Sequence, residues 1–232
     1  MAIGRNRRLA NTGLLVGLML LLAYSAVAVL GRSFNFDNQI QLAAKRYGSH
    51  GQQTLEQWRN LLRSLENSDR NEQTKQVNTF VNGHVVFTED SVAWGQSDYW
   101  ATPLESMGRG VGDCEDYAIA KYFSLLILGI PADHLRITYV RARIGGPLSS
   151  VYEAHMVLAY YPSVDAEPLI LDNLIDEIRP GSRRPDLTPI FSFNSDGLWI
   201  GTSPGTPSSG SSTSRLSHWR DLIARMHADG FE

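Results

Sequence analysis

Halfway along the chain, apolar residues at helical spacing give way to runs that are typical of β-strands. Residues 114–128 have the pattern of a strongly apolar helix, which Gly129 and Pro131 end, as a C-terminal glycine followed by proline commonly does. Four β-like runs follow, separated by turn residues: 135–144, 152–161, 169–174 and 188–193. Helices followed by an antiparallel meander predict an α+β fold, with N-terminal helices and the apolar helix packed on an antiparallel sheet.

Two more helices are expected upstream of this point. Apolar residues recur at helical spacing within 54–65, and a second helix is indicated across roughly 72–86. Residues 88–112 lack a clean period, are rich in aromatic residues, and end in closely spaced glycines just before Asp113 and Cys114. This segment is therefore expected to be a loop packed near a functional site.

Composition excludes several classes of protein. The 232 residues suffice for one domain with a sizeable core, and 43% hydrophobic with 19% charged residues is ordinary for a globular chain. A net charge of −3 provides no basic surface for nucleic acid. The single cysteine, Cys114, excludes an intramolecular disulfide and a cysteine-rich zinc site, so it is either a buried apolar residue or a reactive thiol.

The N-terminus has the pattern of an export signal. Arg5, Arg7 and Arg8 precede an uncharged apolar run, residues 14–30, and a small-x-small cleavage pattern lies at residues 26–28. The run is also about long enough to span a bilayer uncleaved. Residues 1–31 are therefore interpreted as a signal peptide or an N-terminal signal anchor, and the chain would touch a membrane only through this segment. A buried core helix is the weaker alternative, because the run has no polar face.

The remainder divides into three parts. Residues 32–200 form the main domain, and residues 201–214 consist only of Gly, Ser, Thr and Pro, which is typical of a flexible linker. Residues 215–232 contain apolar residues at helical spacing and are expected to form a short amphipathic helix that docks back on the core or on a partner.

Cys114 lies where the glycine-rich segment becomes a helix. The macrodipole and unbonded N–H groups at a helix start favour a thiolate, so this is a suitable position for a nucleophile. Such a thiolate needs a histidine partner. Of the six histidines, only His155 falls within a predicted strand that follows this helix.

Asp172 is a carboxylate in the otherwise apolar run 169–174, where burial without a partner would be costly. If the strands that carry His155 and Asp172 are neighbours, Asp172 can bind the outer nitrogen of His155 and set its tautomer. Each of these residues alone is more often structural. The chain order Cys114, His155, Asp172 is that of a papain-like or transglutaminase-like thiol site.

Four stretches now indicate a family: GDCEDYAIAKYFSLLILGIP, EAHMVLAYY, EPLILDNL and, upstream of them, DYWATPLE. Together they resemble the bacterial transglutaminase-like cysteine proteinases of the LapG type, over roughly residues 35–195. The resemblance implies a transglutaminase-like cysteine protease domain with Cys114, His155 and Asp172 as its catalytic triad.

The same resemblance implies a periplasmic, calcium-dependent endopeptidase. Proteases of this family cut a large surface adhesin at a pair of alanines in its N-terminal region, which releases the adhesin and disperses biofilm. The resemblance also implies an inhibitor, the periplasmic domain of an inner-membrane cyclic-di-GMP receptor.

Three carboxylates, Asp113, Glu115 and Asp116, flank Cys114 and would raise the pKa of its thiol. A hard cation such as calcium would neutralise them, with further oxygens from the preceding loop, where Asp98 is a candidate. Without the resemblance, Asp113 is more simply a helix N-cap and Glu115 a favourable first-turn acid. With it, calcium bound by Asp113, Glu115 and Asp116 is the preferred interpretation. The chain has no interleaved acidic loop of the EF-hand kind.

Three other functions remain compatible with these residues. An amine could intercept a thioester at Cys114, which would make the protein a transglutaminase or amidase. The domain could be a non-catalytic binding module of the same fold. The C-terminal helix, through Trp219 and its neighbours, could instead serve a structural partner.

Overall fold

The computed structural model describes residues 34–163, 165–200 and 217–231. Its helices and strands all belong to one compact unit, Asn35–Phe231. The predicted signal segment 1–31 and the predicted linker 201–214 lie outside the described residues. Among the described helices, none combines the length and apolar character needed to cross a membrane.

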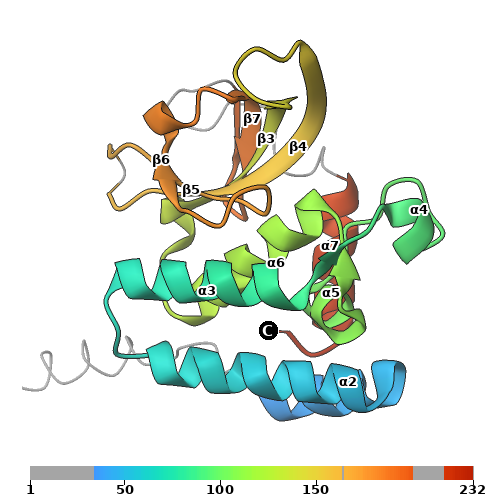
Figure 1. Cartoon of the computed structure of the whole chain (residues 1–232). Coiled ribbons are helices and arrows are strands. Elements are labelled where there is room, and N and C mark those ends of the chain that lie inside the picture. The colour runs from blue at the N-terminus through green and yellow to red at the C-terminus, as the bar shows by residue number, and fades with distance from the viewer. Residues whose placement is uncertain (1–33, 164, 201–216, 232) are drawn as a thin grey trace, which may run out of the picture. The chain divides into compact units, whose positions relative to one another are not determined.

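Helix α6 lies between a sheet and the other long helices (Figure 1). It contacts strands β3 and β4 on one side and helix α3 on the other, and α3 in turn contacts α2. The helices are α2 (Phe36–Leu65), α3 (Arg70–His84), α4 (Asp90–Ala93), α5 (Pro103–Arg109), α6 (Cys114–Ile127) and α7 (Ser217–Ala228), with 3₁₀ turns η1 (Ala132–His134) and η2 (Gly181–Arg183). The observed arrangement is the expected α+β fold.

The first helix is much longer than its sequence pattern predicted. Prediction placed it at residues 54–65, whereas α2 starts at Phe36, after an N-cap bond from the amide of Asn38 to the side chain of Asn35. Gly48 interrupts it with a φ of 70°, a left-handed conformation that favours glycine. The first half of α2 buries few apolar residues, so its helical periodicity is weak. This half of the helix was therefore not predicted.

The segment 88–112 is not the plain loop that was expected. It contains α4 and α5, and β1 (Val86–Phe87) pairs in parallel with β2 (Val111–Gly112). Helix α5 starts with a capping box, in which the amide of Glu105 donates to Thr102 and the Glu105 carboxylate accepts from the Thr102 amide. The sequence signal was present as Thr-Pro-Leu-Glu, but the helix is too short to show a period.

The main sheet has six antiparallel strands in the order β6-β5-β4-β3-β7-β8. They are β3 (Leu135–Ile144), β4 (Val151–Tyr160), β5 (Leu169–Leu171), β6 (Arg179–Pro180), β7 (Leu187–Phe193) and β8 (Leu198–Ile200). Strands β3 to β6 form a meander of consecutive neighbours. Strand β7 then pairs with the opposite edge of β3. The run 169–174 ends as a strand at Leu171, so Asp172 follows β5 and is not part of it, contrary to the prediction.

The short strand β5 determines where Asp172 lies. Leu171 pairs with Leu158 of β4, and β5 pairs with no residue of β4 before Leu158. The chain therefore leaves the sheet at Asp172, on the side of β4 that leads towards His155. Beneath the sheet, Ile119, Tyr122 and Leu125 of α6 are fully buried and form much of the core.

Helix α7 packs on this same unit. Its buried residues are Trp219, Leu222 and Met226, and the Trp219 ring stacks on Phe123 of α6 with centroids 5.8 Å apart.

Candidate active site

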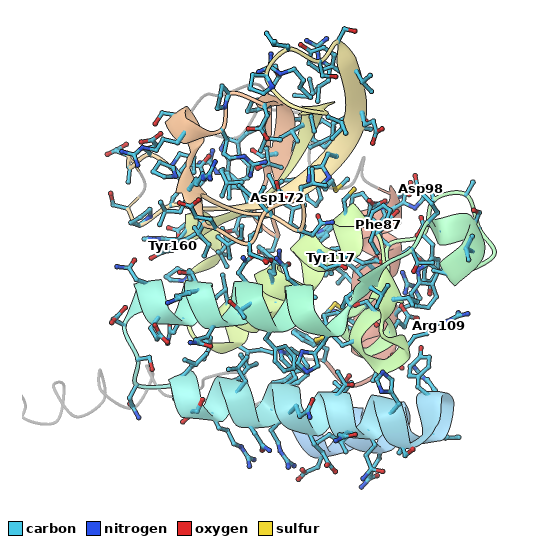
Figure 2. The ribbon with its side chains drawn as sticks, viewed as in Figure 1. Phe87, Asp98, Arg109, Tyr117, Tyr160 and Asp172 are labelled. Carbon is cyan, nitrogen blue, oxygen red and sulfur yellow. The ribbon has the colours of Figure 1, made fainter. Side chains whose placement is uncertain are left out.

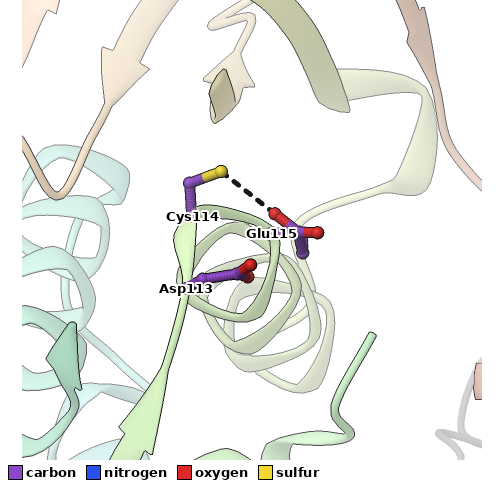
Figure 3. A group of neighbouring side chains, drawn as sticks. All are labelled: Asp113, Cys114 and Glu115. Atoms are coloured by element: carbon purple, nitrogen blue, oxygen red, sulfur yellow. Dashed lines mark hydrogen bonds between the residues drawn. The ribbon is translucent and has the colours of Figure 1, made fainter. Parts of the chain in front are cut away.

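Cys114 is the first residue of α6, directly after the N-cap Asp113. Its thiol is partly exposed and donates a hydrogen bond of 3.0 Å to Oε2 of Glu115 (Figure 3). Burial raises the pKa of this thiol, and the negative charges of Glu115 and Asp113 raise it further. The thiolate-favouring effect of the helix start is thus outweighed as long as the neighbouring carboxylates are ionised and uncompensated.

His155 lies in β4 and is only 5% exposed. Its Nε2 is 2.8 Å from Oδ1 of Asp172, which is 1% exposed. With Nε2 as the donor in this bond, Nδ1 is the nitrogen left to accept a proton from a thiol. The carboxylate therefore orients the ring and selects the tautomer that a thiol site needs.

Asp172 itself is held by several groups. Its Oδ2 accepts 2.7 Å from Nη2 of the buried Arg184, its Oδ1 also accepts from the amide of Leu174, and its carbonyl accepts from Nδ2 of Asn82 on α3. Burial acts to raise the pKa of Asp172, but His155, the amide of Leu174 and Arg184 outweigh it and hold that pKa well below its usual range. Asp172 is therefore ionised at neutral pH.

Arg184 was missed by sequence reasoning. It binds both Asp172 and Asp186, each at 2.7 Å, and so links the carboxylate to the turn before β7. The sequence offers only two adjacent arginines, Arg183 and Arg184, and nothing in their pattern shows which one is buried.

Cys114 and His155 line one pocket of about 410 Å³. Other lining residues come from strands β1, β3, β4 and β7, from the segments before and at the start of α6, and from the turn after Asp172: Phe87, Glu89, Asp98, Trp100, Asp113, Glu115, Tyr139, Ile144, Glu153, Ala154, Met156, Leu174 and Phe191. Among the described residues, no hydrogen bond joins the thiol to His155. Figure 2 shows Asp172 near the boundary between the sheet and the helices. The pocket thus combines a thiol, an oriented imidazole, and walls that carry both apolar side chains and several carboxylates.

The carboxylates beside Cys114 form three overlapping groups whose ligand atoms lie within 4.8 Å of one another. The groups are Asp113 with Cys114 and Glu115, Asp90 with Asp113 and Asp116, and Asp90 with Asp98 and Glu115. The structure therefore brings together all three predicted metal-binding acids and the candidate Asp98. It adds Asp90, which the sequence did not indicate. Asp90 is far from Cys114 along the chain, and an acid at the start of a short helix is common.

Two buried carboxylate oxygens in these groups have no hydrogen-bond partner among the described residues. They are Oδ1 of Asp90 and Oδ1 of Asp113. Burial raises the pKa of Asp90 to about 6, and burial with the charges of Glu115 and Asp116 raises the pKa of Asp113 to about 10. Buried carboxylate oxygens without donors are what a hard cation with oxygen ligands requires, so the residues present fit calcium.

Asp116 has a different environment from its neighbours. Its Oδ1 accepts 2.6 Å from the amide of Ala101, and its Oδ2 accepts 3.4 Å from the amide of Asp113. Burial raises the pKa of Asp116 well above its ordinary value. Asp116 therefore ties the start of α6 to the segment before α5.

Comparison with known proteins identifies relatives. A family model described as bacterial transglutaminase-like cysteine proteinase matches residues 48–185. A search of curated proteins gives no match.

Solved structures of Legionella pneumophila LapG resemble the chain closely. An EGTA-treated form is 37% identical with a TM-score of 0.71, and covers 82% of this chain and 97% of its own. A calcium-bound form is 40% identical with a TM-score of 0.69, and covers 81% and 97% respectively.

Proposed function

Because this chain belongs to the bacterial transglutaminase-like cysteine proteinases, we propose that it cleaves peptide bonds with Cys114 as nucleophile, His155 as acid and base, and Asp172 as the residue that orients His155. The observation that carries this assignment is the 2.8 Å bond between Nε2 of His155 and the buried carboxylate of Asp172. That bond leaves Nδ1 for the thiol with which His155 shares a pocket.

In this mechanism, Nδ1 of His155 takes the proton of the Cys114 thiol, and the thiolate attacks the scissile carbonyl carbon. The imidazolium then protonates the leaving amine, which leaves a thioester on Cys114. His155 next removes a proton from water, which attacks the thioester and releases the acid and the thiol. Backbone N–H groups at the start of α6 stabilise the oxyanion in both steps.

Calcium is proposed to bind at the carboxylates beside the thiol, with Asp113, Glu115 and Asp116 joined by Asp90 and Asp98. The calcium-bound state of a relative that is 40% identical and the buried, unpartnered oxygens of Asp90 and Asp113 support this site. A bound calcium ion supplies positive charge that offsets these carboxylates. With Glu115 engaged by the ion, its carboxylate would no longer accept the hydrogen bond of the Cys114 thiol, and the thiol would be free to donate to His155.

The substrate class is proposed from the family resemblance. It is a large cell-surface adhesin, cut at a pair of alanines in its N-terminal region, so that the adhesin is released and biofilm disperses. The protein would act in the periplasm, after export through residues 1–31, or anchored by them in the inner membrane. The periplasmic domain of an inner-membrane cyclic-di-GMP receptor would inhibit it.

The test combines alkylation with cleavage. Iodoacetamide labelling of Cys114, read by intact mass with and without calcium, should be fast in the unmodified chain and slow in His155→Ala. His134→Ala is the matched control, because His134 lies on η1, away from the pocket residues, and its ion pair with Asp133 has a separation of 4.0 Å. Slow labelling that is indifferent to calcium and to His155 would mean an inert thiol and would favour a binding module.

Cleavage tests the substrate. A purified N-terminal adhesin fragment should be cut by the unmodified chain and not by Cys114→Ala, and replacing the paired alanines by arginines should prevent the cut. Normal cleavage by Cys114→Ala would overturn the assignment. Product mass separates hydrolysis from acyl transfer, since hydrolysis adds water across a cut chain whereas transfer joins an amine.

A further inference from the structure

Helix α7 follows the predicted linker, and its role was left open by the sequence. Its apolar face is buried against the unit, but its most extensive polar contacts involve one residue, Arg225. Apart from one bond within α7, these contacts reach Tyr99 and Trp100, between α4 and α5, and Glu105, in the first turn of α5. The segment between α4 and α5 also carries Asp98, one of the proposed calcium ligands.

Arg225 uses every arm of its guanidinium group. Its Nη2 donates 2.6 Å to the carbonyl of Trp100, and its Nη1 donates to Glu105 and, at 2.9 Å, to the hydroxyl of Tyr99. Its Nε donates to Asp221 within α7, and the guanidinium carbon lies 4.5 Å from the centre of the Tyr99 ring. A planar fork of donors at fixed angles makes such a set of bonds, and a lysine ammonium cannot reproduce it.

The opposite side of the same segment binds the proposed calcium ligands. The amide of Tyr99 donates 2.5 Å to Oδ2 of Asp90, and the amide of Ala101 donates 2.6 Å to Oδ1 of Asp116. The backbone amides of Tyr99 and Ala101 therefore bind two of the carboxylates, while Arg225 binds the backbone carbonyl of Trp100 between them. The remaining oxygen of Asp90 is buried and has no donor within the described part of the chain, so the segment that binds the other oxygen sets the orientation of this carboxylate.

A second contact of α7 reaches the same place. His218, in the first turn of α7, lies 3.3 Å from Asp98 and stacks on the Trp100 ring with centroids 5.7 Å apart. Trp100 and Asp98 both line the pocket that contains Cys114. The first and third turns of α7 therefore both contact the wall of this pocket.

We propose that Arg225 is a positioning residue for calcium: through residues 99–101 it presets the carboxylates of Asp90 and Asp116, so that α7 determines the calcium affinity of the site. This inference rests on the proposed function. A site whose ligands are already in place binds calcium more tightly, because binding does not have to include the entropic cost of ordering these side chains. Without Arg225, the segment has to be ordered by the ion itself, and the affinity falls.

The test is calorimetric titration of the purified full chain with calcium chloride. Arg225→Met, which keeps an apolar stem but removes all donors, should lower the calcium affinity at least about tenfold, and Arg225→Lys should lower it nearly as much. Arg220→Met is the matched control on the same helix, since Arg220 is exposed, and its affinity should stay within about twofold of the unmodified chain.

A second variant separates positioning from general loosening of α7. Arg46→Met removes the paired bonds from α2 to Asp229, just past the end of α7, and touches none of residues 99–101. It should lower the melting temperature of the calcium-free chain while leaving the calcium affinity within about threefold.

Each outcome decides a different question. Normal affinity in Arg225→Met, or an equal loss in Arg46→Met, would overturn the positioning role alone. A failure of the unmodified chain to bind calcium would overturn both the calcium part of the proposed function and this inference.

Discussion

Asp172 binds His155 and Arg184, and their chemistry explains why a buried carboxylate is tolerated just after an apolar strand. His155 and Arg184 each bind one of its oxygens, at 2.8 and 2.7 Å. Burying an ion is costly unless such partners compensate, so Asp172 and Arg184 depend on each other. The same carboxylate that stabilises this pair also orients the imidazole.

Asp172→Asn should slow the alkylation of Cys114 by about 10²–10⁴-fold, because an amide no longer selects the tautomer of His155 that can take the thiol proton. It should also destabilise the chain by about 3–5 kcal/mol, since Arg184 loses a buried anionic partner. Alkylation rates and urea unfolding measure the two effects. Asp186→Asn is the control, because Asp186 binds Arg184 but not His155. An alkylation rate in Asp172→Asn close to that of Asp186→Asn would contradict the assignment.

Lys121 is the second unusual residue at this scale. It lies on α6, is 1% exposed, and its Nζ has no hydrogen-bond partner among the described residues. Burial lowers the pKa of Lys121 to about 7, although the charge of Asp172 opposes the shift. The native state thus binds this proton more weakly than the unfolded chain does.

Lys121→Met should therefore raise the free energy of unfolding by about 1–2 kcal/mol near pH 6, where the lysine is buried with its charge. The gain should shrink as the pH rises from about 7 towards about 10, because the native lysine is then already neutral and the unfolded chain progressively loses the same proton, so folding no longer has to release it. Urea unfolding across this pH range measures the difference. A gain that is independent of pH would show that packing, and not charge, is responsible.

At the scale of elements, the junction between β2 and α6 has little spare room. A Cβ atom at Gly112 would lie 2.6 Å from Oδ2 of Asp116. The Asp116 carboxylate cannot move away without breaking its bonds to the amides of Ala101 and Asp113. The glycine before the thiol is therefore required by close approach and not by its dihedral angles.

Gly112→Ala should destabilise the chain by about 1–3 kcal/mol, because it overpacks this junction. It should also weaken calcium binding, since Asp116 and Asp113 are displaced together. Gly83→Ala is the matched control on α3: an added Cβ there meets nothing within 4 Å, and alanine should stabilise the helix by about 0.5–1 kcal/mol. Thermal unfolding and calcium titration of both variants test this. Equal stability of Gly112→Ala and the unmodified chain would show that the junction can adjust.

At the scale of the whole molecule, acids from distant parts of the chain meet at one place. Asp90, Asp98 and residues 113–116 come together although the chain as a whole has a net charge of only −3. With the pKa of Asp90 raised to about 6 and that of Asp113 to about 10, the native state without a cation binds protons more tightly than the unfolded chain. Its stability should then fall as the pH rises above about 4.

Calcium should remove this penalty by replacing the protons. The difference in melting temperature between the calcium-loaded and the chelated chain should therefore grow as the pH rises from 5 to 8. Asp113→Asn should reduce the pH dependence of the chelated chain. A calcium effect of constant size across this range would indicate binding elsewhere.

The order of elements could be predicted because their signals are local. Helix α6 has a strong apolar pattern with a glycine and proline stop, and the strands near 135–144, 152–161 and 188–193 alternate clearly enough to be placed within a residue or so. The first half of α2 and helix α5 could not be placed. One has too few buried residues for a period, and the other is too short to show one.

The sequence by itself determined the chemistry that is available: one thiol at a helix start, one histidine on a strand, and one carboxylate in an otherwise apolar run. Those features depend on residue type and on neighbours along the chain. Only the tertiary structure decided which distant groups complete them. Arg184 on Asp172, Asp90 beside Asp113, and Arg225 behind residues 99–101 are contacts across many residues of chain. Electrostatic and hydrogen-bonding partners act through space over a few ångströms, and sequence spacing carries no information about such distances.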